Sequence, residues 1–232
     1  MVKELGKFFV FEGPDGCGKS TAFLNVVRLL NEIELLDKFR IMREPGGELY
    51  LSIDNKLCPY PGQYQEDLRE AFIKKREQKV SCQSEIQTFT SLRHQNGKDI
   101  IKPSVRSGIN VLSDRYVISS MAYQGMRFGD ETTPGKVLVQ NIEFANLHVP
   151  DVIYYFRLSF EECLKRKGQT GSKDRIESED LESKKRIFQG YLDAPEIFNK
   201  YYPEETEFVD VDASKSEEEI AKYILDDIIW RI

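Results

Sequence analysis

The chain has 232 residues, of which 40% are hydrophobic and 31% charged, and this composition is typical of a globular domain with a substantial core. Its formal net charge of −6 argues against a nucleic-acid-binding protein, which usually carries a basic excess. No apolar run approaches the length of a membrane span, Met1–Leu5 opens no leader-like apolar segment, and four scattered cysteines form neither a disulfide framework nor a zinc site. We therefore expect a cytoplasmic protein without a membrane or nucleic-acid partner.

Short apolar segments alternate with longer segments of helical periodicity along the chain. The predicted strands are Lys7–Glu12, Phe39–Arg43, Asn110–Ser113, Asp151–Arg157 and Glu207–Val211. The predicted helices are Lys19–Asn31, Ser84–Asn96, Thr133–Leu147, Ser159–Lys167, Glu179–Tyr201 and Ser216–Ile229. Strands separated by helices indicate right-handed crossovers, and so a single α/β domain over residues 1–232 with a five-stranded parallel sheet covered on both faces.

The segment from 54 to 83 is an insertion into this alternation. Cys58–Tyr64, with its prolines and glycine, is typical of a loop, and the charge-rich Glu66–Lys79 is typical of an exposed helix to which we assign no function. The segment could shape a pocket, cover it or form a subunit contact.

A phosphate-binding loop follows the first predicted strand. Gly13–Thr21 (GPDGCGKST) matches the G-x-x-x-x-G-K-[ST] motif between a strand and a helix, which is the context that the motif requires. Its backbone N–H groups and the helix N-terminus attract phosphate, Lys19 reaches β- and γ-phosphates, and the Ser20 hydroxyl can ligate Mg²⁺. The motif predicts a P-loop NTPase fold with a nucleotide site, and Cys17 is a small filler rather than a nucleophile.

Two arginines lie at the ends of neighbouring predicted strands. Arg43 ends the second strand and Arg115 follows the third, so both fall at the carboxyl edge of the sheet, where the phosphate loop also lies. A random arginine is more often a surface ion-pair partner. Beside a phosphate loop, however, two arginines favour a clamp that holds a second anion in line with the nucleotide.

Four motifs in order resemble the thymidylate kinase family across nearly the whole chain, from about Phe8 to Asp212. They read G-x-D-G-x-G-K-S-T, R-E-P-G-G, D-R-Y-x-x-S-S-x-A-Y-Q-G and D-R-I-E. The resemblance implies phosphorylation of dTMP to dTDP by ATP with Mg²⁺, and a homodimer.

The resemblance also implies roles for residues of the acceptor site. Asp15 would contact the sugar 3′-hydroxyl, and Arg43 and Arg115 would hold the acceptor phosphate. Phe89 would stack on the base and Arg93, one helical turn later, would reach its carbonyl edge. Asp114 would lie near the magnesium and the acceptor phosphate, although it could instead only brace Arg115. Further candidates are Ser119, Ser120, Tyr123 and Gln124 around sugar and base.

Further candidates belong to the donor site and to a lid over residues 166–177. The ATP-binding candidates are Gly13, Pro14, Asp15, Gly16, Cys17, Gly18, Lys19, Ser20, Thr21, Arg166, Asp212 and Ala213. Gly16 fills the loop position where some family members carry an arginine, which implies that lid cations stabilise the transferring group. Arg166, Lys173 and Arg175 are the lid candidates, although a solvated charged turn explains the same residues.

Three other functions remain open from the sequence. The chain could phosphorylate another or a modified pyrimidine deoxynucleotide, because a small difference in a base pocket discriminates only about 10–200-fold. A nucleoside kinase would leave the two-arginine clamp unused. A nucleotide-dependent switch would use Asp114 as a magnesium ligand and leave Arg115 incidental.

Overall fold

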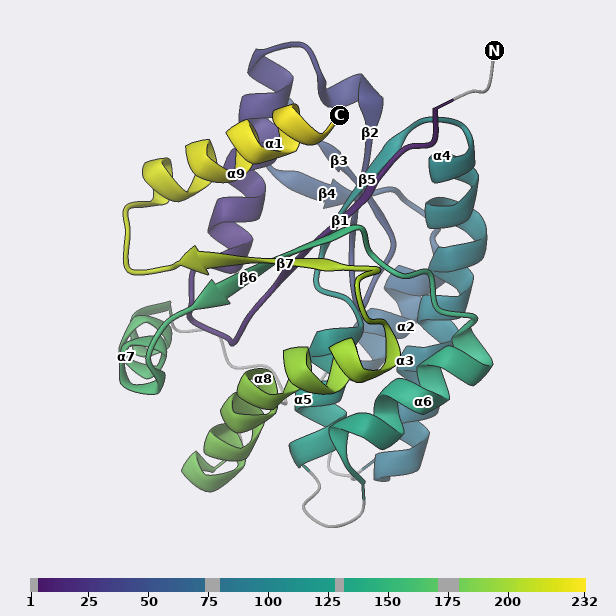
Figure 1. Ribbon diagram of the computed structural model, residues 1–232, viewed down its shortest axis with the longest axis vertical. Coiled ribbons are helices and arrows are strands. Elements are labelled where there is room, and N and C mark those ends of the chain that lie inside the picture. The colour runs from purple at the N-terminus through teal and green to yellow at the C-terminus, as the bar shows by residue number, and fades with distance from the viewer. Residues whose placement is uncertain (1–3, 74–79, 128–131, 171–179) are drawn as a thin grey trace.

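The computed structural model describes residues 4–73, 80–127, 132–170 and 180–232. The five predicted strands all form, as β1 (Phe8–Glu12), β2 (Phe39–Arg43), β5 (Asn110–Asp114), β6 (Val152–Arg157) and β7 (Glu207–Asp212). They pair in parallel in the order β2-β5-β1-β6-β7 (Figure 1). In this register Arg43 lies opposite Asp114, and Asp114 lies opposite Phe11, so the carboxyl ends of the three strands meet at one edge.

The predicted count of five strands is wrong, because two antiparallel strands extend the sheet beyond β2. β3 (Glu48–Leu51) and β4 (Leu57–Pro59) form a hairpin, which gives seven strands in the order β4-β3-β2-β5-β1-β6-β7. Asn55 turns the chain with a φ of 55°, and Arg28 of α1 (Lys19–Glu32) donates to its carbonyl at 2.7 Å. β4 occupies part of the segment that we predicted as a loop.

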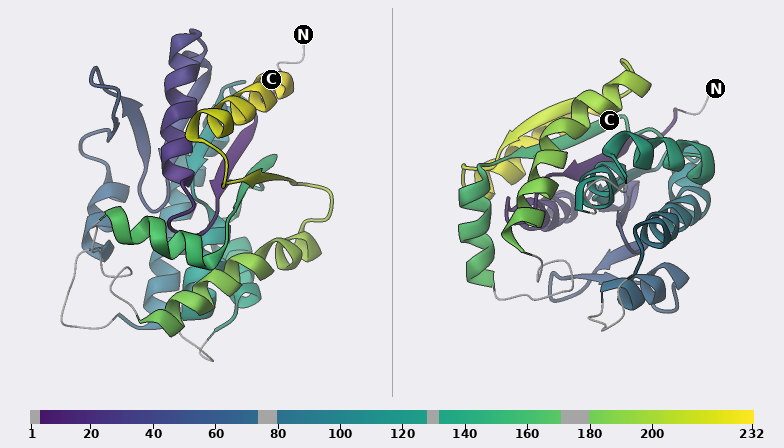
Figure 2. Two further views of the ribbon diagram at one scale, coloured as in Figure 1. Left: turned by 90° about the vertical axis from the view of Figure 1, so that its left-hand side faces the viewer. Right: turned by 90° about the horizontal axis from the view of Figure 1, so that it is seen from below.

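Helices cover both faces of the sheet, as the alternation of strand residues requires. Phe9 and Phe11 of β1 pack with α1 and α9 (Glu217–Arg231), whereas Phe8 and Val10 pack on the opposite face. Figure 2 shows α1 and α9 side by side on one face. The other helices are α2 (Tyr64–Ile73), α3 (Cys82–Asn96), α4 (Lys102–Arg106), α5 (Val117–Arg127), α6 (Pro134–Ala145), α7 (Phe160–Thr170) and α8 (Leu181–Tyr201), with a 3₁₀ turn at Leu36–Lys38 and a π-helical turn at Gly97–Ile101.

The helix α5 was not predicted, although it follows β5 directly. Its serines and Gly125 are weak helix formers, so local propensity does not identify it. Packing stabilises it instead: α8 lies against α5 so closely that a Cβ added at Gly190 would be 2.9 Å from the Cα of Ala122. This contact brings Tyr191 of α8 beside the start of α5.

Within the residues described above, no helix combines the length and the apolar character that a bilayer crossing requires.

Candidate active site

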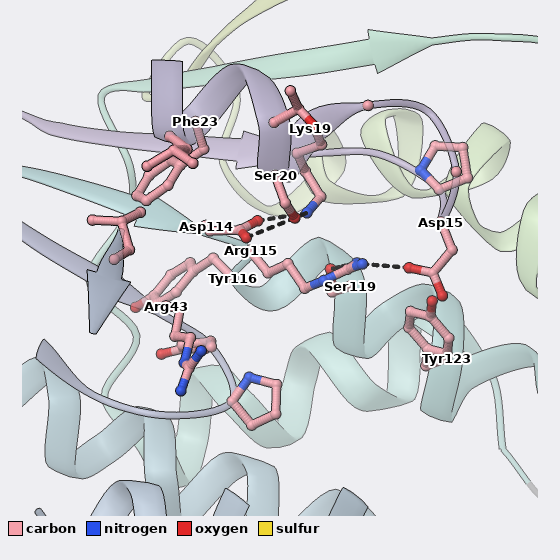
Figure 3. A pocket seen from close by; sticks show the side chains of 18 of the residues that line it. Asp15, Lys19, Ser20, Phe23, Arg43, Asp114, Arg115, Tyr116, Ser119 and Tyr123 are labelled. Atoms are coloured by element: carbon pink, nitrogen blue, oxygen red, sulfur yellow. Dashed lines mark hydrogen bonds and ion pairs between the residues drawn. The ribbon is translucent and has the colours of Figure 1, made fainter. Parts of the chain in front are cut away.

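One large cavity opens at the carboxyl edge of the parallel strands, with a volume of about 990 Å³. The phosphate loop, the ends of β2 and β5, and helix α5 contribute to its wall (Figure 3). Residues of α2, α3 and α7 line it as well. Most of the predicted site residues line it: Pro14, Asp15, Gly16, Gly18, Lys19, Ser20, Thr21, Arg43, Phe89, Arg93, Asp114, Arg115, Ser119, Ser120, Tyr123, Gln124 and Arg166.

The phosphate loop has the backbone conformation that its glycines allow. Gly16 and Gly18 have φ angles of 85° and 89°, in the region that residues with a Cβ rarely adopt. A Cβ at Gly16 would also lie 2.3 Å from the carbonyl oxygen of Cys163 on α7. Gly18 then caps the N-terminus of α1 without a side chain, so the first N–H groups of α1 can bind an anion.

Lys19, Ser20 and Asp114 meet at the centre of the cavity. The Ser20 hydroxyl donates to one oxygen of Asp114 at 2.9 Å, and the Lys19 ammonium binds the other oxygen (Figure 3). Burial alone would raise the pKa of Asp114, but Lys19 and Arg115 lower it below its usual value. Asp114 is therefore a carboxylate. It binds the ammonium group of Lys19, the cation that a bound triphosphate would require.

A hydroxyl and a carboxylate side by side suit a hard cation that takes oxygen ligands. No cluster of three or more His, Cys, Asp or Glu side chains that could hold a metal occurs in the part of the chain that the structure describes. Ser20 and Asp114 thus offer oxygen atoms of the kind that Mg²⁺ takes as ligands.

Arg115 lies between the phosphate loop and α8, and its backbone φ of 74° is unusual for a residue with a side chain. Its guanidinium forms an ion pair with Asp15, and it donates to Tyr191 at 2.9 Å and to Ser119 at 3.2 Å. Figure 3 shows Arg115 directed across the cavity toward Asp15. Tyr191 was not among the predicted site residues, because its role depends on the packing of α8 on α5.

Asp15 is held by two cations at once. Besides Arg115, the ammonium of Lys167 on α7 lies 2.7 Å from its second oxygen. Burial would raise the pKa of Asp15, but Arg115 and Lys167, with a hydrogen bond from Tyr123, lower it well below its usual range. Lys167 is thus a cation of the predicted lid region that sequence analysis did not assign to the site.

Arg43 points into the cavity but carries a partner of its own. Its Nη2 lies 2.7 Å from Oε2 of Glu66, and its Nε lies 3.2 Å from Oε1. Glu66 is in α2, and Arg69 and Phe72 of the same helix also line the cavity. The predicted helix therefore forms, but it is only partly exposed, because Arg69 and Phe72 line the cavity. Glu66, Arg69 and Phe72 follow at intervals of three residues, the spacing that could have indicated one functional face.

The far end of the cavity is aromatic and closed by a buried arginine. Phe89 and Phe72 pack edge to face with ring centroids 5.7 Å apart. Arg93 is 2% exposed and binds Glu44, Ser120 and Asn141. The predicted placement of Phe89 and Arg93 on one face of α3 is confirmed, since both line the cavity.

A second buried carboxylate supports the start of α5. Glu12 ends β1, is fully buried, and accepts hydrogen bonds from the backbone N–H groups of Tyr116 at 2.6 Å and Ser119 at 3.1 Å. It also accepts the Ser119 hydroxyl at 2.7 Å. Burial raises the pKa of Glu12, and Arg115 opposes that shift. Ser119, predicted to line the pocket wall, therefore also connects Glu12 to Arg115.

The remaining predicted residues lie around or outside the cavity. Gly13, Cys17, Asp212 and Ala213 do not contribute to its wall, and Cys17 is 1% exposed. Arg166 does contribute, and it donates to the Ala213 carbonyl at 3.0 Å, which ties α7 to the end of β7. Lys173 and Arg175 lie outside the described residues.

A phosphate-binding loop and two arginines from neighbouring strand ends, all lining one cavity, define a class of protein, the P-loop nucleotide kinases. The comparison with a solved structure supports this fold: a thymidylate kinase from Ehrlichia chaffeensis superposes with a TM-score of 0.62 at 24% identity, covering 94% of this chain and 98% of that one.

Sequence comparisons identify the family within this class. The family model for thymidylate kinase matches residues 59–224. A thymidylate kinase from Francisella tularensis is 33% identical over 94% of this chain and 93% of its own length. Another from Lactobacillus acidophilus is 29% identical over 98% of this chain and 95% of its own length. The chain belongs to the thymidylate kinase family, and with it to the nucleoside monophosphate kinases.

Proposed function

We propose that the chain transfers the γ-phosphate of ATP to dTMP, which yields ADP and dTDP. The observation that carries the proposal is the position of Arg115, which follows β5 and reaches Asp15 of the phosphate loop. A cation between two phosphate sites is what a kinase with a phosphate acceptor requires, because the two anions repel each other. Family membership supports dTMP as the acceptor.

The donor phosphates would lie on the phosphate loop, against the N-terminus of α1. Lys19 would exchange its contact with Asp114 for the β- and γ-phosphates. Ser20 and Asp114 would hold Mg²⁺, which when bound neutralises charge on the phosphates. Arg166 and Ala213, joined by a hydrogen bond, would lie toward the nucleoside of ATP.

The acceptor would extend from Arg115 to the aromatic end of the cavity. Its phosphate would lie between Arg43 and Arg115, and its base would stack on Phe89 with the carbonyl edge toward Arg93. Asp15 and Tyr123 lie beside Arg115 and would contact the sugar. Gln124 donates from its Nε2 to Oε1 of Glu85 at 2.8 Å, and it would form the cavity wall near the base.

The transfer itself requires positioning more than acid–base chemistry. An oxygen of the acceptor phosphate is already ionised near neutral pH, so no side chain has to remove a proton from the attacking group. Arg115, Lys19 and the basic side chains of the lid would stabilise the charge on the transferring group. Arg166 and Lys167 are the lid cations within the described residues, and Lys173 and Arg175 remain candidates beyond them.

The test is an assay of ADP release with ATP, Mg²⁺ and a panel of monophosphates that includes dTMP, dUMP and dCMP, with thymidine as a non-phosphorylated acceptor. We expect dTMP to give the highest kcat/KM and thymidine to give no rate above background. ATP turnover that is the same with and without any acceptor would contradict the proposal.

A homodimer and a cytoplasmic location complete the proposal. Phe144 on α6 is 69% exposed and lies outside the cavity, where a second subunit could cover it. Sedimentation over a range of micromolar concentrations tests the homodimer. A monomer at every concentration would exclude it.

A further inference from the structure

Arg93 is held from several sides by side chains that come from three other parts of the fold. Its Nε and Nη2 lie 2.8 and 2.7 Å from Oε2 of Glu44, which directly follows β2. Its Nη1 donates to Asn141 of α6, and its Nη2 donates to Ser120 of α5 at 3.1 Å. The guanidinium carbon lies 5.1 Å from the ring centroid of Tyr116.

The partners of Arg93 are themselves fixed and buried. Glu44 is 6% exposed, Asn141 1% and Ser120 4%. Asn96, one turn after Arg93, donates to the other oxygen of Glu44 at 3.3 Å and to the Gly46 carbonyl at 2.9 Å. Asn141 donates to the Val137 carbonyl at 2.8 Å, so its oxygen is the atom directed at Arg93. Rotation of the guanidinium would leave these buried polar groups without partners, which costs free energy.

Arg93 carries five N–H groups, and the contacts above use that of Nε, both of Nη2 and one of Nη1, which leaves one N–H of Nη1 in a side chain that lines the cavity. A guanidinium only donates. Its cavity side therefore suits a base edge with a carbonyl acceptor, such as that of thymine or uracil, and opposes an exocyclic amino group. The orientation of the guanidinium, rather than its presence alone, decides which base fits.

We infer that Glu44 and Asn141 are positioning residues that fix Arg93 for readout of the acceptor base. The inference rests on the proposed function, because it assumes that the base lies between Phe89 and Arg93. Neither residue needs to touch the nucleotide. Glu44 fixes the plane of the guanidinium through Nε and Nη2, and Asn141 fixes Nη1 from the opposite side.

The test compares Glu44→Gln and Asn141→Ala with wild type on three acceptors: dTMP, dCMP and deoxyribose 5-phosphate, which has the phosphate and sugar but no base. Glu44→Gln keeps the shape of the side chain and removes its charge. We expect kcat/KM for dTMP to fall about 10- to 100-fold in Glu44→Gln, through KM, and by a smaller factor in Asn141→Ala. The KM for ATP and the value for deoxyribose 5-phosphate should change less than about three-fold, and the ratio of dTMP to dCMP should fall.

The acceptor without a base separates positioning from folding, since a smaller folded fraction lowers the rates with all acceptors equally and leaves their ratios unchanged. Asp227→Asn is the matched control, because Asp227 also binds an arginine, Arg231, whose side chain is 9% exposed, and neither residue lines the cavity. Equal losses with dTMP and deoxyribose 5-phosphate, or no loss in either variant, would overturn the inference. If wild type prefers a monophosphate with another base, the proposed function fails. The loss of kcat/KM for that acceptor in Glu44→Gln, compared with the loss for deoxyribose 5-phosphate, then still decides the role of Glu44.

Discussion

Three of the cations proposed to bind the phosphates are each bound to a carboxylate in the structure. Lys19 pairs with Asp114, Arg43 with Glu66 and Arg115 with Asp15. Such pairs keep the cations oriented in a partly buried cavity at a lower electrostatic cost than isolated charges would have. Phosphate binding would then exchange one anion for another rather than bury new charge.

The ion pairs of Asp15 predict how acid affects stability. Because the pKa of Asp15 is lowered by Arg115 and Lys167, its contribution to stability is complete above the unfolded value of about 3.9 and is lost as the pH falls toward the folded pKa. We expect Asp15→Asn to reduce the free energy of unfolding by about 1–3 kcal/mol from pH 8 to 5, and the difference to shrink below about pH 4. Urea denaturation across this pH range measures it. A difference that grows on acidification would contradict the assignment.

The cysteines predict a pattern of chemical labelling. Burial raises the pKa of the Cys17 thiol to about 11 and that of Cys163 to about 12, so both are thiols at neutral pH. We expect iodoacetamide at pH 7.5 to modify the half-buried Cys58 and to leave Cys17 and Cys163 unmodified in the native protein. Mass spectrometry after digestion reads the sites. Rapid modification of Cys17 would contradict the prediction that Cys17 is a small filler rather than a nucleophile.

At the scale of elements, the contact between α5 and α8 positions the side chains of the proposed acceptor site. Gly190 allows α8 to approach the backbone of Ala122, and the next residue, Tyr191, then binds Arg115. A methyl group at Gly190 has to displace α5, since the Cα of Ala122 is 2.9 Å from its expected position.

We therefore expect Gly190→Ala to destabilise the protein by about 1–3 kcal/mol and to lower activity, because Tyr191 moves with the helix. Gly135→Ala in α6 is the control: the nearest atom to its added Cβ is 3.8 Å away, and alanine favours the helix. Thermal unfolding with rate measurements compares the two. Equal stability of both variants would show that α5 and α8 do not depend on this contact.

The sequence predicted the elements whose patterns are local. The five parallel strands were found because each is an apolar run between turn residues, and α3 was found because its apolar residues follow helical spacing. The hairpin of β3 and β4 was missed because its strands have four and three residues, too short for a period to show. Glu66 and Tyr191 were missed because their partners lie 23 and 76 positions away along the chain, in other elements.

At the scale of the whole molecule, the sheet brings these distant residues together. Parallel pairing aligns the ends of β1, β2 and β5, so one edge presents the phosphate loop, Arg43, Asp114 and Arg115. The net charge of −6 conceals this local concentration of cations. The lid candidates Lys173 and Arg175 lie outside the described residues, and their place in the site stays a prediction.

The measurement that tests the account most directly is the dTMP-dependent release of ADP by Arg115→Ala beside Arg157→Ala. Arg115 directly follows β5 and Arg157 ends β6, but Arg157 pairs with Asp210 at the surface and does not line the cavity. We predict that kcat/KM for dTMP falls at least about a hundred-fold in Arg115→Ala and less than about two-fold in Arg157→Ala, with both proteins folded. An Arg115→Ala enzyme that keeps its rate with dTMP would contradict the central claim that this arginine holds the acceptor phosphate.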